Sequence, residues 1–101
     1  MTVKAFKLIT GEELICTTDD MVTLDGGGYI NVKNAAVVIL RDDERGQMHL
    51  GLLPYAPYAE SVMLYNRGIV AELMINIKLE NEYNRMFGSG IQIATADQIK
   101  A

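Results

Sequence analysis

The stretch YINVKNAAVVIL, residues 29–40, limits the possible folds of this chain more than any other part of it. In its first half Ile30 and Val32 alternate with Tyr29, Asn31 and Lys33, which is the pattern of a strand with one buried and one wet face. Over residues 35–40 the pattern becomes continuously apolar, which is typical of a strand covered on both faces, or covered on one face by a neighbour. We therefore predict a single long strand that bends.

Other short runs also have the composition of strands. They are rich in β-branched, aromatic and other apolar residues and are separated by turn sequences such as TGEE, DGGG, RDDERG and NRG. The run at 69–77 has an apolar face at period two, although its composition also tolerates a helix. Predicted strands cover residues 3–9, 14–18, 29–40, 47–53, 62–65 and 69–77. About five bent antiparallel strands joined by hairpins predict a mainly β fold, a small open antiparallel barrel.

One helix is predicted after these strands, in the sequence KLENEYNRMFG. Leu79, Tyr83, Met86 and Phe87 form a single apolar stripe at helical spacing. Asn76 can cap its beginning, and Gly88 can end it. We expect this helix to cover an open end of the barrel. The predicted organisation is one domain over residues 1–101, with the barrel at about 1–77, the C-terminal α-helix at about 77–88 and a tail at 89–101.

The segment PYAPYAES, residues 54–61, interrupts this pattern of strands. Proline has no N–H group for a β-ladder, so Pro54 and Pro57 indicate a sheet edge, a bulge or a break. Tyr55 and Tyr58 could pack against the protein or face a ligand, and packing is the favoured interpretation.

Composition narrows the possible functions. Half of the 101 residues are hydrophobic, so a core can form, and the formal net charge is −4. There is no global basic field to attract nucleic acid, so any polyanion must be bound by a local patch, for example one repeated by symmetry. No apolar run approaches the roughly 20 residues of a membrane span, and the N-terminal sequence does not resemble a signal peptide. With a single cysteine, the chain is expected to be a soluble cytoplasmic protein.

Catalytic and metal sites are not expected. Cys16 and His49 are the only cysteine and the only histidine, so no cluster of these ligands can be built. The acidic residues of the turns are interpreted as solvated, although a carboxylate metal site among them is an alternative. The three glycines at 26–28 lack the lysine and the following helix of a phosphate-binding loop. We expect no enzyme activity, no metal and no cofactor.

Binding residues are easier to suggest. The wet face of the third strand presents Tyr29, Asn31 and Lys33, which combine a ring for stacking, an amide and a cation. The same residues could instead solvate the sheet or contact a neighbouring subunit. The sequence NRG offers Arg67 beside a glycine that permits close approach of a backbone, although a plain β-turn explains it equally well. The candidate nucleic-acid-binding residues are Tyr29, Asn31, Lys33, Asn66, Arg67 and Gly68.

Two motifs resemble those of the Sm-like (Sm/LSm) proteins. The sequence FKLITGEEL, followed by a strand, a loop and a long bent strand, is similar to their first motif, and LYNRGIV is similar to their second. The chain as a whole resembles the small Sm-like proteins of marine cyanophages, from its FKLITGEEL start to its YNRMFGSGI end. It departs from the family in having its helix after the barrel and in lacking an Asp-x-x-Met-Asn box before the third strand. By position, Tyr29 or Asn31 would replace the base-binding asparagine of that box.

The resemblance implies an SH3-like barrel of five strands that assembles into a closed homo-oligomeric ring of five to seven subunits and binds single-stranded RNA or DNA. It also implies that the fourth strand pairs with the fifth strand of the next subunit, with PYAPY interrupting the fourth. Two functions follow as hypotheses: a non-catalytic, RNA-binding ring in the cytoplasm of an infected bacterial host, or a phage structural or assembly protein whose ring binds another protein. The expected interface residues are Tyr55, Tyr58, Val62, Leu64, Ile69, Ala71 and Leu73.

Overall fold

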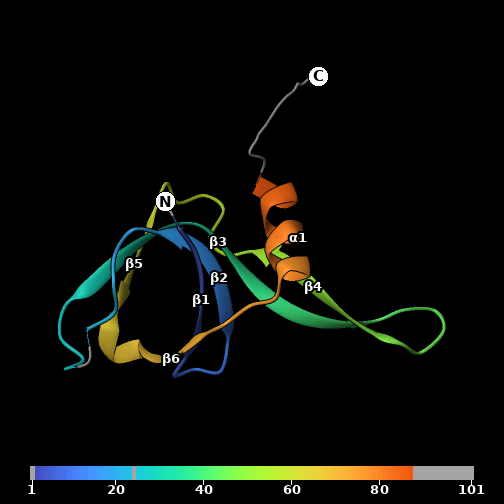
Figure 1. The fold of residues 1–101 in the computed structure, drawn as a ribbon, viewed down its shortest axis with the longest axis horizontal. Helices are drawn as coiled ribbons and strands as arrows, with labels where there is room; N and C mark the ends of the chain where they lie inside the picture. The colour runs from blue at the N-terminus through green and yellow to red at the C-terminus, as the bar shows by residue number, and fades with distance from the viewer. Residues whose placement is uncertain (1, 24, 88–101) are drawn as a thin grey trace, which may run out of the picture.

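A computed structural model describes residues 2–23 and 25–87 of the chain (Figure 1). It is mainly β, with one helix at the C-terminal end of the described residues, as the sequence predicts. The elements are β1 (Thr2–Leu8), β2 (Glu13–Thr18), β3 (Tyr29–Asp42), β4 (Met48–Pro54), β5 (Val62–Tyr65), a 3-10 turn η1 (Asn66–Gly68), β6 (Ile69–Leu73) and α1 (Ile77–Phe87).

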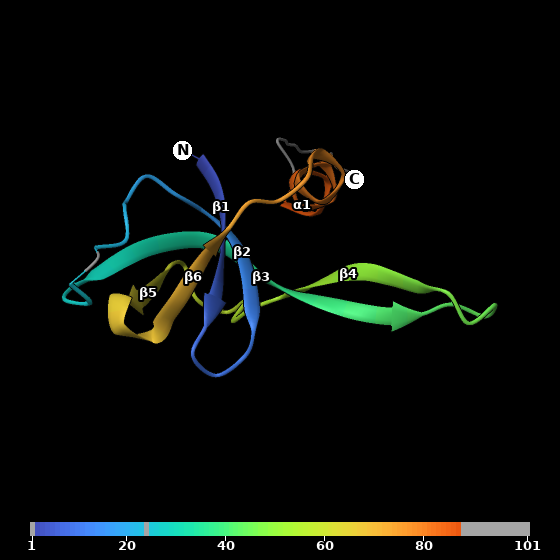
Figure 2. The same cartoon turned by 60° about the horizontal axis from the view of Figure 1, so that its bottom comes forward.

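The strands form one antiparallel arrangement in the order β4-β3-β2-β1-β6, and β5 pairs with β3. In the part of the chain that the structure describes, β6 pairs only with β1, and β4 and β5 pair only with β3, so the sheet does not close on itself. Figure 2 shows β1, β2 and β6 crossing the long β3 while β3 and β4 extend away from them together. An antiparallel sheet is therefore confirmed, whereas closure into a barrel is not.

The predicted bend of β3 is confirmed and has a specific cause at Asn34. Between β2 and β3 the register passes from Ile15↔Ala36 to Thr17↔Lys33, so β3 contains one extra residue, a β-bulge. Asn34 has a positive φ of 53°, a conformation that asparagine tolerates better than most other residues. Before the bulge β3 pairs with β5, and after it β3 pairs with β4 along Ala36–Asp42.

The sheet is covered by apolar side chains on both faces. On the concave side an interior cluster consists of Phe6, Leu14, Cys16, Ile30, Val32, Ala35 and Leu64. On the opposite side a helix-side cluster consists of Ala5, Ile15, Ala36 and Tyr83, with Val38, Leu52, Leu79 and Phe87 packed against it. Neighbours along β1 and β2 alternate between the two clusters, as strand geometry requires. Burial raises the pKa of Cys16 in the interior cluster to about 12, so this thiol stays protonated at neutral pH.

The sequence predicts that helix α1 covers an open end of the barrel. In the structure α1 lies elsewhere. Its buried Tyr83 belongs to the helix-side cluster, so the helix packs on the face of the sheet opposite the interior (Figure 2). The predicted cap is confirmed, because the backbone N–H of Leu79 donates to Asn76 Oδ1 at 2.9 Å. The Tyr83 hydroxyl lies 2.6 Å from Thr17 Oγ1 and 3.4 Å from the carbonyl oxygen of Lys33, which ties the helix to β2 and β3.

The proline-containing segment ends one pairing and begins another. Pro54 is the last residue of β4, and the N–H of Tyr55 donates to the Ala35 carbonyl at 2.8 Å. Ala56 then has a positive φ of 51°, and the chain returns to β3 only at Val62. Tyr55 packs against the interior cluster, whereas Tyr58 is 91% exposed. The favoured packing role is therefore confirmed for Tyr55 alone.

The end of the last strand also differs from the sequence expectation. The run at 69–77 is a strand only through Leu73, because Leu73 and Ile75 turn toward the helix-side cluster before α1 begins at Ile77. Gly88 and the tail at 89–101 lie outside the described residues. Within residues 2–23 and 25–87, no helix has the length and apolarity needed to cross a membrane.

The position of Tyr83 predicts how strongly the helix stabilises the fold. Tyr83→Ala should lower the free energy of unfolding by about 3–5 kcal/mol, because it empties a buried aromatic site. Tyr83→Phe should cost about 1 kcal/mol, the value of the hydrogen bond shared with Thr17. Urea denaturation followed by circular dichroism measures both, with the exposed Asn84→Ala as the control. A loss below 1 kcal/mol for Tyr83→Ala would contradict this packing.

Candidate nucleic-acid interface

The loop at residues 19–28 is held against the turn between β5 and β6 by Asn66. The Asn66 side-chain Nδ2 donates to Thr23 Oγ1 at 2.9 Å and to the Gly27 carbonyl at 2.6 Å, and its backbone N–H donates to the Gly28 carbonyl at 3.0 Å. Asn66 is only 4% exposed. Its Oδ1 is buried without a hydrogen-bond partner. The two segments, 38 or more residues apart in sequence, therefore form one structural unit.

The loop also has its own internal hydrogen bonds. Thr23 Oγ1 donates to the Gly27 carbonyl at 2.7 Å, and the N–H of Gly27 donates to Asp25 Oδ1 at 2.9 Å. The hydrogen bond from Gly27 is the main reason that the pKa of the Asp25 carboxyl lies below its ordinary value. Gly26 and Gly28 both have positive φ, at 77° and 74°, a conformation in which a side chain would be strained. These glycines allow the loop to turn, and the strand β3 follows them.

A hollow of about 360 Å³ opens between this loop and β6. Val22, Thr23 and Gly26 line it from the loop, and Arg67 lines it from the turn. Residues of β6 complete it, including Glu72. Arg67 is exposed, so its guanidinium is available to a ligand, but Glu72 lies on the same hollow. One copy of the chain therefore brings no excess of positive charge to this place.

The other predicted binding residues lie on a different surface. Tyr29, Asn31 and Lys33 are exposed on the outward face of β3, opposite the inward-facing Ile30 and Val32. On the paired strand Tyr65 faces Tyr29, with ring centroids 6.2 Å apart in an edge-to-face arrangement. Met63 faces Asn31 in the same register, and the side chains of Met63 and Tyr65 are both about half exposed. The result is an outward surface of two tyrosines, a methionine, an amide and a lysine.

The structure therefore divides the predicted nucleic-acid-binding residues into four groups. Tyr29, Asn31 and Lys33 share the outward face of β3, and Arg67 borders the hollow. Gly68 accepts a hydrogen bond from the N–H of Ile9 through its carbonyl. The Asn66 side chain is buried and holds the loop, and its contact with nucleic acid stays a prediction. Thr23 and Tyr65 also lie at these surfaces and were not predicted; Tyr65 is the last residue of the apolar strand β5, and that position was the available signal.

The side chains of the predicted interface residues point in different directions, some into the core of the same chain and some toward solvent. Val62, Leu64 and Ile69 belong to or pack against the interior cluster, and Leu73 packs in the helix-side cluster. Their side chains therefore stabilise the single chain, and only their backbones lie at free edges. Ala71 and Tyr58 are exposed. At the edges of β5 and β6, the exposed apolar side chains are instead Met63, Tyr65 and Val70.

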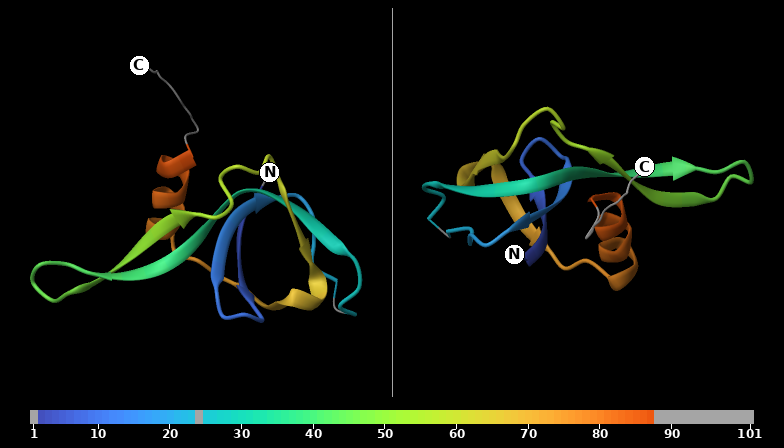
Figure 3. Two further views of the ribbon diagram at one scale, coloured as in Figure 1. Left: turned by 180° about the vertical axis from the view of Figure 1, so that it is seen from behind. Right: turned by 90° about the horizontal axis from the view of Figure 1, so that it is seen from above.

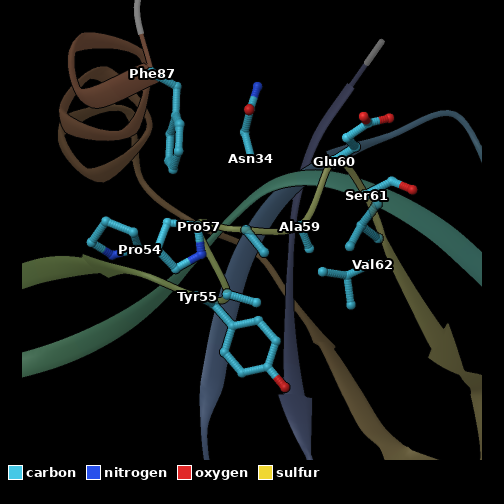
Figure 4. A pocket seen from close by; sticks show the side chains of 12 residues that line it. Asn34, Pro54, Tyr55, Pro57, Ala59, Glu60, Ser61, Val62 and Phe87 are labelled. Carbon is cyan, nitrogen blue, oxygen red and sulfur yellow. The ribbon is translucent and has the colours of Figure 1, made fainter.

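A second, smaller cavity of about 190 Å³ lies beside the proline-containing segment. Figure 4 shows Pro54, Pro57 and Phe87 around it, with Asn34 at its side. Among the described residues that line it, most are apolar, and Glu60 is the only one with a carboxyl group.

The described residues contain no group of three or more His, Cys, Asp or Glu side chains that could hold a metal ion. His49 Nε2 lies 2.8 Å from Asp43 Oδ2 near the end of the β3–β4 hairpin, and this hydrogen bond lowers the pKa of the Asp43 carboxyl.

A comparison with models of known protein families and a comparison with curated proteins both give no match.

The role of Asn66 can be tested by its removal. Asn66→Ala should lower the free energy of unfolding by about 1–3 kcal/mol, because the Gly27 carbonyl and the Thr23 hydroxyl lose a donor at a partly buried junction. It should also speed amide hydrogen exchange across residues 19–28 relative to β1 and β2. Asn31→Ala, on an exposed face, is the control and should change stability by less than about 0.5 kcal/mol. Unchanged exchange in the loop would show that other contacts hold it.

Proposed function

We propose that the chain is a non-catalytic, Sm-like subunit of a closed homo-oligomeric ring that binds single-stranded nucleic acid, preferentially RNA. The observation on which this proposal rests is the junction made by Asn66. It brings the loop before β3 and the Arg-Gly turn after β5 to one hollow. These are the two segments in which the resemblance to Sm-like proteins places nucleotide contacts. The SH3-like barrel is part of the same proposal, with β4 and β5 as two parts of one interrupted strand.

Unpaired strand edges support assembly into a ring. In the described residues β5 and β6 each have one edge without a partner strand, and they are consecutive in the chain. Unpaired edges invite association, and a head-to-tail pairing repeated by rotation can close. In such a ring β5 of one subunit pairs with β6 of the next, and Met63, Tyr65 and Val70 contribute apolar contacts. Closure also places the Arg67 side chains in a circle, which provides the phosphate contacts that one copy lacks.

The binding proposal predicts a specific effect of Arg67. Arg67→Gln should weaken binding of a short single-stranded oligouridylate about tenfold or more, because each charge-assisted contact contributes about 1.5–3 kcal/mol. It should also reduce the dependence of affinity on salt concentration. Fluorescence anisotropy at several salt concentrations measures both quantities.

Arg45→Gln, in the exposed turn between β3 and β4, removes the same charge away from the hollow and is the matched control. Equal effects of the two variants would show that only overall charge matters. Absence of binding by the wild type at low salt would exclude the nucleic-acid function.

The ring proposal predicts a change in mass when the β5 edge is charged. Leu64→Asp is unsuitable because Leu64 belongs to the interior cluster and its substitution would unfold the chain. Met63→Asp instead charges an outward, half-exposed position on β5 and should convert a ring of five to seven subunits to smaller species. Light scattering measures the mass, and circular dichroism verifies the fold. Met74→Asp, in the exposed connection between β6 and α1, is the control and should keep the wild-type mass.

A second function is favoured by the apolar character of the exposed surface: a structural or assembly protein whose ring binds another protein. Tyr29, Met63 and Tyr65 form one exposed apolar surface, and Tyr58 projects from the segment after β4. Aromatic residues and methionine are enriched in protein interfaces. A ring mass in light scattering together with no oligonucleotide binding at low salt would favour this function over the first.

A further inference from the structure

The hairpin of β3 and β4 projects from the rest of the chain as an arm. We use the word arm for residues 38–52. Pairing of β2 with β3 ends at Val37, so in the arm β3 is paired on one side only, by β4. Figures 1 and 3 show the arm extending past β2 and α1. An isolated two-stranded hairpin is only marginally stable in water, so an arm of this kind gains from a further strand.

The backbone groups on the free edge of β4 can be identified from the hydrogen bonds at its two ends. The N–H of Asp43 donates to the Gln47 carbonyl, and the N–H of Tyr55 donates to the Ala35 carbonyl. Between these bonds the β3–β4 register has no shift. Because hydrogen-bonded and non-hydrogen-bonded pairs alternate, the odd-numbered residues of β4 bond to β3. Met48, Leu50 and Leu52 therefore direct their N–H and C=O groups toward the free edge, and Pro54 occupies the next outward position, where no donor is needed.

The same residues form an apolar face. Leu40, Met48 and Leu50 are 64%, 56% and 52% exposed, on the side of the arm that continues into the helix-side cluster. From Met48 to Pro54 the strand contains no lysine, arginine, aspartate or glutamate, and it contains no bulge. Charges and bulges are the usual devices that prevent pairing of an edge strand. The free edge of β4 therefore has both the hydrogen-bonding groups and the apolar side chains that a partner strand requires.

The geometry points to a second copy of the same strand as that partner. We infer that two arms pair antiparallel about a two-fold axis at Leu50, which joins the hairpins into a four-stranded sheet. In this register Leu50 faces Leu50 of the partner subunit, and Met48 faces Leu52 of the partner subunit. All three outward N–H groups and all three outward carbonyls of each copy are then satisfied. On the other face His49 lies beside the partner's Gly51, which has no side chain to obstruct it.

The register centred on Leu50 is favoured over the register centred on Gly51, because only the first leaves Pro54 without a partner-strand residue that needs an N–H donor from it. Centring the axis one residue later, on Gly51, would place Met48 opposite the partner's Pro54. Proline has no N–H, so the Met48 carbonyl of each copy would lose its donor. A shift of one residue between the strands would turn apolar side chains toward the polar face.

The area of this contact predicts a weak dimer. Met86 of the helix, 37% exposed, lines the same recess as Leu50 and Leu52. The exposed fractions of Leu40, Met48, Leu50 and Met86 together equal about two whole residues per copy, whereas a standard interface has about 20–30 residues on each side. Even with the backbone edge, the total stays below the roughly 1,000 Å² of a stable interface. The pairing should therefore depend on concentration, in the micromolar range, and should not involve the edges of β5 and β6.

Disulfide trapping tests both the partner and the register. Leu50→Cys places two thiols at directly paired positions, with Cα atoms about 5.5 Å apart, within the range for a disulfide. Met48→Cys is the matched control, because it has the same strand, the same face and nearly the same exposure. Its two copies would lie about 14 Å apart along the strand direction. The wild-type thiol of Cys16 is buried and does not interfere.

Each variant is equilibrated at micromolar concentration in a glutathione redox buffer and run on a denaturing, non-reducing gel. The covalent dimer of Leu50→Cys should be at least tenfold more abundant than that of Met48→Cys. A mixture of Met48→Cys and Leu52→Cys should give the mixed dimer. Equal yields for Leu50→Cys and Met48→Cys, or no dimer from either, would overturn the inference. Because the gel detects covalent pairs of arms alone, failure of the ring proposal does not affect this result.

Discussion

The hydrogen bonding of β3 on both of its edges determines the rest of this structure. On one edge β3 pairs with β2, and on the other it pairs first with β5 and then with β4. The bulge at Asn34 lies between these two pairings and exchanges the faces of the strand. Before it Ile30 and Val32 point inward, and after it Ala35 and Val37 do so. A strand without this extra residue would turn Ala36 and Val38 away from the helix, so the position of α1 also depends on the bulge.

Much of this architecture could be predicted from the pattern of residues. The alternation through Val32 and the apolar run from Ala35 correctly indicated a long bent strand, because both features reflect the surroundings of individual side chains. The position of the helix could not be obtained in the same way. The stripe of Leu79, Tyr83 and Phe87 shows that one face of the helix is buried but not which surface buries it. The apolar run Leu14–Ile15–Cys16 held a usable signal, since a strand that is apolar at every position is covered on both faces.

The roles of residues in the candidate site could likewise be predicted from the sequence only in part. Asn66 and Arg67 are adjacent polar residues in a turn, and the sequence suggested the same role for both. Tertiary contacts separate them: the Asn66 amide supplies the donors that the loop at 19–28 requires, whereas Arg67 remains exposed. A buried amide nitrogen needs acceptors for its N–H groups, and those of Asn66 come from a loop about 40 residues earlier in the chain. No local pattern encodes that pairing, so it could be found only from the fold.

Electrostatics explains why a function in nucleic-acid binding would require assembly. A single hollow contains Arg67 together with Glu72, so its field is weak, and the formal net charge of −4 opposes the approach of a polyanion. In a ring, neighbouring Arg67 side chains separated by more than about 8 Å would repel one another little at physiological salt. A flexible single strand that contacts several of them at once would add their separate attractions, as linked binding sites do. Affinity would then increase steeply with the number of nucleotides until the circle is occupied, whereas binding to a protein partner would show no such dependence on length.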